Sequence, residues 1–156
     1  MSRFFISLFL SSWVSFLQTT VFADAPLPLA ENTLKIMVTN LRSSQGVIYA
    51  SLYDNEEGFP TDSLKAKTRI KAEILSSQTA EFVFSDLEPG KNYALSVFHD
   101  ENNNEKLDTN FLGMPKEGVG ISNQAKGRFG PPKFKDAQFL FTKELSEIKL
   151  PIKYIF

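Results

Sequence analysis

Near its C-terminus the chain reads EIKLPIKY (residues 147–154), in which polar and apolar side chains alternate with a period of two. One face of this stretch holds Ile148, Leu150, Ile152 and Tyr154. The pattern is that of a β-strand with one face against a hydrophobic core. Because proline has no backbone N–H to donate to a neighbouring strand, Pro151 predicts an edge strand or a solvent-facing proline.

The same period recurs along much of the chain. Shorter alternating or β-rich runs occur at residues 34–39, 47–53, 69–74, 82–84, 93–99 and 137–141. No stretch has a long helical period, and residues 62–67 are compatible with one helical turn capped by Asp62. About seven short strands in one domain predict an all-β fold, a two-sheet sandwich with Greek-key connections, with an open barrel as the alternative.

The composition excludes several classes of function. The chain has 156 residues, 17 Lys plus Arg against 18 Asp plus Glu, one His and no Cys. That length fits one domain. A near-zero net charge produces no long-range field, which argues against nucleic acid or an anionic membrane as a partner. The absence of cysteine excludes disulfides, thiolate nucleophiles and Cys-ligated metals.

The first 23 residues differ from the rest. Arg3 precedes an apolar run over residues 4–17, and Val21-Phe22-Ala23 offers small residues where a signal peptidase cleaves. Residues 1–23 are therefore predicted to be a secretory signal peptide, with cleavage after Ala25 as the alternative. The run is shorter than the roughly 20 residues of a membrane span, which disfavours an uncleaved anchor. We expect a periplasmic or secreted protein without a transmembrane anchor after cleavage, with an extended leader (residues 24–32) and a β-sandwich domain (residues 33–156).

One connection is much too long for a hairpin. Residues 100–136 contain five glycines and three prolines and show no clear alternation. Loops of this length inside a compact domain are usually functional or disordered. A functional site is therefore expected in this Gly/Pro-rich loop.

The start of that loop has the spacing of a calcium-binding loop. Oxygen-bearing side chains fall at its first, third, fifth and ninth positions, and the seventh would contribute its carbonyl. These residues are Asp100, Asn102, Asn104, Asp108 and, for the carbonyl, Lys106. The spacing follows the first part of an EF-hand loop and predicts a Ca²⁺ site. A zinc site is not expected from one histidine and no cysteine.

Two positions differ from the EF-hand pattern. Glu105 stands at the sixth position, where such loops have glycine, and Phe111 stands at the twelfth, where they have a bidentate carboxylate. The last ligand would then come from Asn110, Glu117 or a backbone carbonyl. The alternative is a polar turn whose side chains bond their own backbone.

His99 is the only histidine. One interpretation is a residue at the rim of the core that orients the loop through a hydrogen bond. The alternative is a general base of a hydrolase or isomerase, acting with Asp100 or Glu117 in a cleft under the loop. Ser122 does not lie in a nucleophile elbow, so no residue is assigned as catalytic. The residues expected to contact a ligand or partner are His99, Lys116, Glu117, Ser122 and Asn123.

A basic stretch ends the long loop, with no acidic residue between Gly118 and Lys135. Its cations are Lys126, Arg128, Lys133 and Lys135. This stretch would bind a phosphate or an acidic partner, form a solvated loop, or pair with the acidic residues of 100–108. In the last case Phe111, Phe129 and Phe134 are expected to hold the folded-back loop by burial.

Several motifs occur in a recognisable order. They are GVIYA (46–50), FP (59–60), LEPGKNYA (87–94), HDENNN (99–104), LDTN (107–110), GMPKEG (113–118) and SN (122–123), followed by Pro132, Phe134, Asp136 and Ala137. Together they resemble the bacterial exported proteins grouped as domain of unknown function 2141, whose members usually have glycine at the positions of Asn103 and Glu105. The resemblance implies a bacterial cell-envelope location and no assigned activity.

A second resemblance concerns the fold. FVF (82–84), Leu87, Pro89-Gly90 and YAL (93–95) are similar to the core of prealbumin-like sandwiches, such as the domains beside carboxypeptidases. It implies an immunoglobulin-like or prealbumin-like Greek key.

Three functions remain open. The first is a non-enzymatic binding or interaction module of the cell envelope, whose 100–136 loop, organised by Ca²⁺, binds a protein or small-molecule ligand. The second is the hydrolase or isomerase centred on His99. The third is a purely structural envelope protein.

Overall fold

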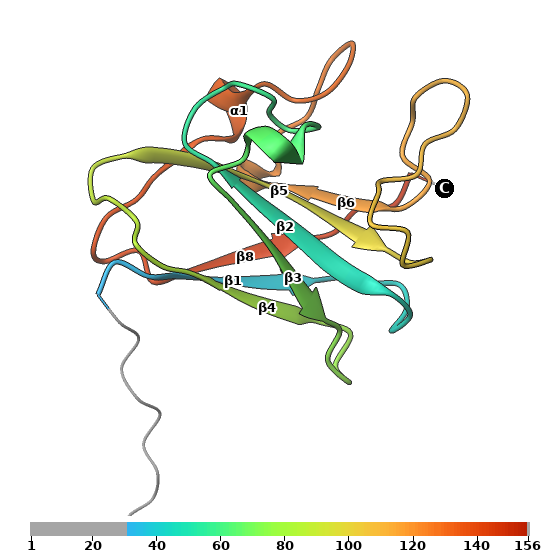
Figure 1. The fold of residues 1–156 in the computed structure, drawn as a ribbon, viewed down its shortest axis with the longest axis horizontal. Helices are drawn as coiled ribbons and strands as arrows, with labels where there is room; N and C mark the ends of the chain where they lie inside the picture. The colour runs from blue at the N-terminus through green and yellow to red at the C-terminus, as the bar shows by residue number, and fades with distance from the viewer. Residues whose placement is uncertain (1–30, 156) are drawn as a thin grey trace, which may run out of the picture.

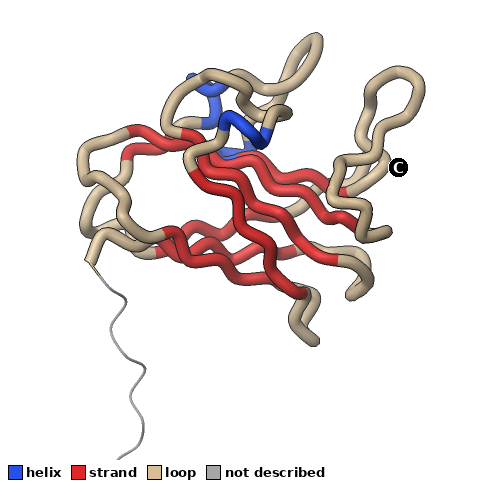
Figure 2. Tube along the Cα trace, viewed as in Figure 1, coloured by secondary structure: helices blue, strands red, loops and turns tan. Residues whose placement is uncertain are grey.

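Two β-sheets form the domain in the computed structural model, which describes residues 31–155. The smaller sheet has the order β4 (Ala80–Phe84), β1 (Leu34–Thr39), β8 (Glu147–Pro151). The larger has the order β3 (Thr68–Glu73), β2 (Val47–Tyr53), β5 (Asn92–Asp100), β6 (Gly118–Ile121), and β7 (Phe139–Leu140) pairs with the start of β5. Figure 1 shows the two layers, and Figure 2 shows the loops that connect them. The predicted all-β sandwich is confirmed, and the sheets do not form the alternative open barrel.

The alternating residues of the strands meet between the sheets. Leu34, Ile36 and Val38 of β1 are completely buried. In the C-terminal stretch Leu150 and Ile152 are buried, and Ile148 and Tyr154 pack partly buried against the same core, as predicted. β8 pairs in parallel with β1 and lies at the edge of its sheet, which agrees with the expectation from Pro151.

The long segment contains a strand that its sequence did not indicate. β6 pairs antiparallel with β5, with Gly120 opposite Val97. Two of its four residues are glycine, so the strand shows no apolar alternation.

The predicted strand at residues 137–141 is mostly wrong. The short helix α1 (Phe134–Ala137) occupies its start, and only Phe139–Leu140 form β7. Ala137 and Phe141 are buried as a strand would bury them, but the N–H of Gln138 bonds the carbonyl of Phe134 and turns the backbone. The helical turn predicted at residues 62–67 is present as η1 (Ser63–Lys65), and Asp62 accepts a hydrogen bond from the N–H of Leu64 (3.1 Å).

The outer face of the larger sheet is covered at one end by aromatic side chains. Tyr53 of β2 packs edge to face on Phe59 (5.2 Å between ring centres), and Phe59 packs in the same way on Phe134 of α1 (5.8 Å). At the other end the guanidinium of Arg69 donates to the carbonyl of Glu105 (3.0 Å), in the loop after β5. The segments expected to carry function therefore lie over this outer face.

The predicted signal peptide and the leader as far as residue 30 lie outside the described residues. None of the helices found between residues 31 and 155 is long and apolar enough to cross a membrane.

Candidate functional site

β6 divides residues 100–136 into two loops. We call residues 101–117 the acidic loop and residues 122–138, which include η2 (Ser122–Gln124) and α1, the basic loop. In Figure 1 both rise past the larger sheet, away from β1, β4 and β8. Most of the predicted site residues lie where these loops leave and rejoin the sheet.

Glu117 closes the acidic loop. Its buried carboxylate accepts hydrogen bonds from the N–H of Glu101 and the N–H of Asp108, both at 3.0 Å. The fully buried Asp100 accepts the N–H groups of Asn104 (3.1 Å) and Glu105 (2.8 Å). Both carboxylates therefore satisfy backbone donors of the loop, which would otherwise be buried without partners.

His99 is completely buried and bonded through both ring nitrogens. Nε2 lies 2.6 Å from the carbonyl oxygen of Gln45, so this nitrogen carries the proton. Nδ1 lies 2.7 Å from the hydroxyl of Tyr154 and therefore accepts from it in the neutral ring. Among the described contacts of the ring there is no hydrogen bond to Asp100 or Glu117.

An ion pair extends this network. Arg42 donates through Nε (3.0 Å) and Nη2 to the two carboxylate oxygens of Glu101, and its guanidinium lies 4.4 Å above the ring centre of Tyr154. The hydrogen bond and charge of Arg42 hold the pKa of Glu101 below its usual value. Burial raises the pKa of the Tyr154 phenol. These contacts join the C-terminal segment, the β1–β2 connection and the start of the acidic loop.

The basic loop is closed in a similar way. The buried hydroxyl of Ser122 donates to the carbonyl of Ala137 (2.7 Å) and accepts the N–H of Leu95 (2.8 Å). The side-chain amide of Asn123 donates to the carbonyl of Gln138 (2.6 Å). Ser122 and Asn123 therefore join the two ends of this loop.

The predicted calcium ligands form a closed turn. The side-chain amides of Asn102 (2.7 Å) and Asn104 (3.1 Å) donate to the two oxygens of Asp108. Their own oxygens accept the N–H groups of Asn104 (3.1 Å) and Lys106 (2.9 Å). Coordination of Ca²⁺ would require both amides to turn their oxygens toward Asp108. The donor set therefore fits an ion only in competition with hydrogen bonds that the turn already makes.

The other proposed ligands are also bonded to the backbone. Asn110 accepts the N–H groups of Leu112 (2.9 Å) and Met114 (3.0 Å), and Glu117 is occupied as described. Within residues 31–155 no group of three or more His, Cys, Asp or Glu side chains is arranged to hold a metal ion.

The turn has the backbone course expected of glycines. Asn103 (φ 59°) and Glu105 (φ 65°), where the resembling family usually has glycine, both adopt the left-handed conformation. Asparagine tolerates this conformation, whereas it is unfavourable for the side chain of Glu105.

The tips of both loops expose apolar residues. The exposed fraction is 94% for Phe111 and 72% for Leu112 in the acidic loop, and Phe129 in the basic loop is fully exposed. Burial of Phe111, Phe129 and Phe134 was expected for a loop folded back onto residues 100–108; Phe111 and Phe129 are not buried, and Phe134 is partly buried, against Phe59. Buried hydrogen bonds close each loop at its base, so neither needs an aromatic anchor.

The basic residues do not pair with the acidic residues of 100–108, which was one of the three alternatives. Among the described residues Lys126, Arg128, Lys133 and Lys135 make no ion pair, either with residues 100–108 or elsewhere. All four are exposed, as is Lys116 in the acidic loop. The basic stretch is solvated in this structure and does not fold back onto the acidic loop.

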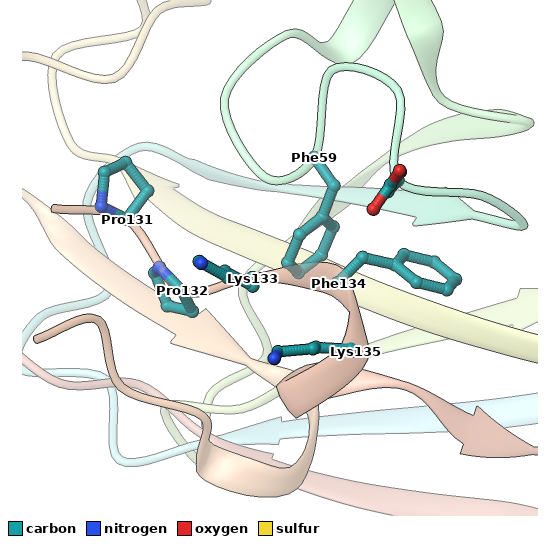
Figure 3. A pocket seen from close by; sticks show the side chains of 7 residues that line it. Phe59, Pro131, Pro132, Lys133, Phe134 and Lys135 are labelled. Atoms are coloured by element: carbon teal, nitrogen blue, oxygen red, sulfur yellow. The ribbon is translucent and has the colours of Figure 1, made fainter.

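A shallow pocket was not indicated by the sequence. It has a volume of about 340 Å³ and is lined by Glu56, Phe59, Pro131, Pro132, Lys133, Phe134 and Lys135 (Figure 3). Residues more than 70 positions apart form it, and no local pattern shows that they meet. The only signals were an aromatic residue beside proline at Phe59-Pro60 and the rigid Pro131-Pro132 pair.

The fold and its two closed loops define a small two-sheet β-sandwich protein. The chain belongs to the family of uncharacterized proteins conserved in bacteria, DUF2141, whose sequence profile matches residues 36–149. The match confirms the resemblance and spans both loops. Comparisons with curated proteins and with solved structures found no significant match.

Proposed function

We propose that this protein is an exported, non-enzymatic binding module of the bacterial cell envelope, and that residues 100–136 form its surface for a protein or small-molecule partner. One observation carries the proposal. The polar residues of this segment that resemble catalytic groups are buried and bonded to the backbone, whereas Phe111, Leu112, Met114 and Phe129 face solvent. Export is supported by the N-terminal sequence, and a bacterial source by the family.

The tip of the acidic loop is suited to binding. Asn110 organises it through two backbone hydrogen bonds, and Thr109 and Pro115 pair across it. A tip that is already ordered loses little conformational entropy when it binds. Exposed apolar groups such as Phe111 and Leu112 gain free energy when a partner removes them from water.

The enzymatic alternative is less well supported. A general base must reach the proton that it removes, either directly or through one water. His99 is completely buried, its Nδ1 lone pair is engaged by Tyr154, and its Nε2 proton by Gln45. Glu117 is engaged by two backbone donors. In this arrangement Glu117 supports the acidic loop, and His99 joins the β1–β2 connection to the C-terminal segment.

Site-specific photo-crosslinking in intact bacteria tests the binding proposal. A photoreactive amino acid replaces Phe111 in one strain and Leu64 in another; Leu64 is 90% exposed but lies on η1, outside the segment. Discrete adducts from position 111 and none from position 64 are expected. Equal labelling at the two positions, or none at 111, would contradict the proposal.

Calcium is the second part of the proposal. We propose that Asp108, Asn102 and Asn104, together with Asp100 and the carbonyl of Lys106, hold one Ca²⁺. The convergence of the first three on one point of the turn supports it. A ligand at 100 times its dissociation constant stabilises the folded state by about 2.7 kcal/mol. The melting temperature of the metal-stripped protein should therefore rise in millimolar calcium, and Asp108→Ala should abolish the rise. An unchanged melting temperature in calcium would show that residues 100–108 form a polar turn without an ion.

A further inference from the structure

We infer that the basic loop docks the protein on an anionic phospholipid membrane, with Phe129 inserted among the lipids and the neighbouring cations on the headgroup phosphates. The inference goes beyond the proposed function, because a membrane is neither a protein nor a small-molecule partner, and it concerns the basic loop of the same segment.

The first observation is the position of Phe129. It is fully exposed, with no neighbouring side chain to remove it from water. The turn that displays it is tight, because a Cβ atom on Gly127 would overlap the carbonyl of Gly130. Ser122 and Asn123 fix the base of the loop to Ala137 and Gln138. The aromatic ring therefore projects from a closed loop.

The second observation is the charge around that ring. Lys126 and Arg128 precede Phe129, and Lys133 and Lys135 follow it, all exposed and none in an ion pair within the described residues. In Figure 3 the amines of Lys133 and Lys135 point the same way, beside Pro131 and Pro132. The acidic residues of this region are Glu56, which lines the pocket, and Asp136 of α1.

Local charge decides attraction to a surface. Electrostatic interactions are screened beyond about 10 Å at moderate ionic strength, so a patch of four cations attracts anions although the whole chain is nearly neutral. The near-zero net charge disfavours an anionic membrane as a partner of the chain as a whole, but it does not describe the local charge of this patch.

The combination of groups favours lipid over an acidic protein. A phospholipid surface presents phosphates directly above hydrocarbon, which matches cations set beside one projecting aromatic ring. The acidic loop offers an internal comparison. Phe111 is almost equally exposed, but its loop combines Lys106 and Lys116 with Glu101, Glu105, Asp108 and Glu117, so it offers an anionic surface no excess of positive charge.

A tryptophan reporter tests the inference. Trp13, the only tryptophan, lies in the predicted signal peptide and is replaced by Phe so that uncleaved precursor adds no emission. In this Trp13→Phe background Phe129→Trp places a single reporter at the tip of the basic loop. Phe111→Trp in the same background is the matched control. Exported protein is mixed with vesicles of phosphatidylcholine alone or with one quarter phosphatidylglycerol. The expected result is a blue shift and co-sedimentation with the anionic vesicles for Phe129→Trp, and no shift for Phe111→Trp.

Charge variants complete the test. Each Lys→Gln or Arg→Gln change among the four cations should weaken binding about fivefold. Lys71→Gln, on the exposed face of β3, should leave it unchanged. No shift at position 129, equal shifts with neutral vesicles, or a shift only at position 111 would overturn membrane docking. Adducts from position 111 in cells together with a silent position 129 would overturn the membrane inference and leave the binding proposal standing.

Discussion

Single buried polar residues keep the long segment in place. Glu117, Asp100 and Ser122 are buried and bond directly to backbone of the long segment. The buried His99 joins the carbonyl of Gln45 to the hydroxyl of Tyr154 beside the start of that segment. A buried donor left without a partner destabilises a protein by about 1–3 kcal/mol. The same residue types that suggest catalysis in a sequence are therefore explained here by the satisfaction of the backbone.

Glu117→Gln tests this role. Glutamine has one acceptor oxygen, so its NH₂ group would face either the N–H of Glu101 or that of Asp108. The free energy of unfolding should fall by about 1–3 kcal/mol, measured by urea denaturation. Glu73→Gln, at an exposed position on β3, should change it by less than about 0.5 kcal/mol. Equal effects of the two substitutions would show that Glu117 does not close the loop.

Glu105→Gly tests the strain in the acidic turn. Glu105 has φ 65°, which glycine adopts without steric penalty. We expect stabilisation of roughly 0.5–1 kcal/mol, because relief of the left-handed strain exceeds the added entropy of the unfolded chain. Lys106→Gly, next to it but without a positive φ, should destabilise instead. Thermal unfolding of the two variants distinguishes them by sign.

At the scale of elements, β6 depends on glycine at the two positions that face the C-terminal segment. Its Val119 exchanges two backbone hydrogen bonds with Lys153 (2.9 and 2.8 Å), which joins the larger sheet to the C-terminal segment. The flanking Gly118 and Gly120 face Ile152, and a Cβ atom at Gly118 would overlap both Ile152 and Tyr154. The strand can therefore approach the C-terminal segment only because these positions are glycine.

Gly118→Ala should destabilise the fold by about 1–3 kcal/mol, the usual effect of overpacking. Gly120→Ala is the matched control, because its Cβ would lie 3.0 Å from Ile152 and 3.3 Å from Leu150, which is tight but less severe than the overlap with Ile152 and Tyr154 at Gly118. Its effect should be clearly smaller. Chemical denaturation measures which variant loses more stability. A larger loss for Gly120→Ala would show that β6 does not need glycine at position 118 to approach the C-terminal segment.

At the scale of the whole molecule, a polar network joins segments that are far apart in sequence. Arg42, Glu101, His99 and Tyr154 connect the β1–β2 connection, the end of β5 and the C-terminal segment. The network lies at the end of the sandwich where the acidic loop begins. Arg42 therefore links the start of this loop to the β1–β2 connection and to Tyr154 of the C-terminal segment.

The ion pair in this network predicts a pH dependence. The pKa of Glu101 is lower in the folded protein than in the unfolded chain. Its contribution is therefore complete above the usual carboxyl pKa and is lost as the pH falls through the lowered value. Because the pair is partly exposed, we expect about 0.5–1 kcal/mol. Glu101→Gln should be less stable than the wild type at pH 7 and equal to it at pH 2. For the control Lys71→Gln, the difference in stability from the wild type should be the same at pH 7 and at pH 2.

The sequence predicted a strand correctly where apolar and polar side chains alternate along it. Residues 34–39 and 147–154 alternate fully, and the structure buries the predicted face of each. β6 was missed because two glycines leave no pattern to detect. The strand predicted at residues 137–141 was misplaced because its buried side chains are shared between a helical turn and a two-residue strand.

The candidate site followed only in outline. The acidic spacing located a turn, and the Gly/Pro content located the long segment. The roles of Ser122 and Glu117 could not be predicted, because their partners are up to 27 residues away and are backbone atoms, which leave no trace in the side-chain sequence. Burial of Phe111 and Phe129 was expected only if the long loop folded back onto residues 100–108. The loop does not fold back, and hydrogen bonds at the base of each loop hold it instead.

The sequence by itself determined the fold class, the family and the segment in which polar and apolar residues concentrate, because periodicity and motif order are local properties of the chain. Only the tertiary structure decided which strands pair, that β1 and β8 run parallel, and which residues of the long segment are buried. Those outcomes depend on contacts between distant residues, whose free energies arise only when the two sheets pack together.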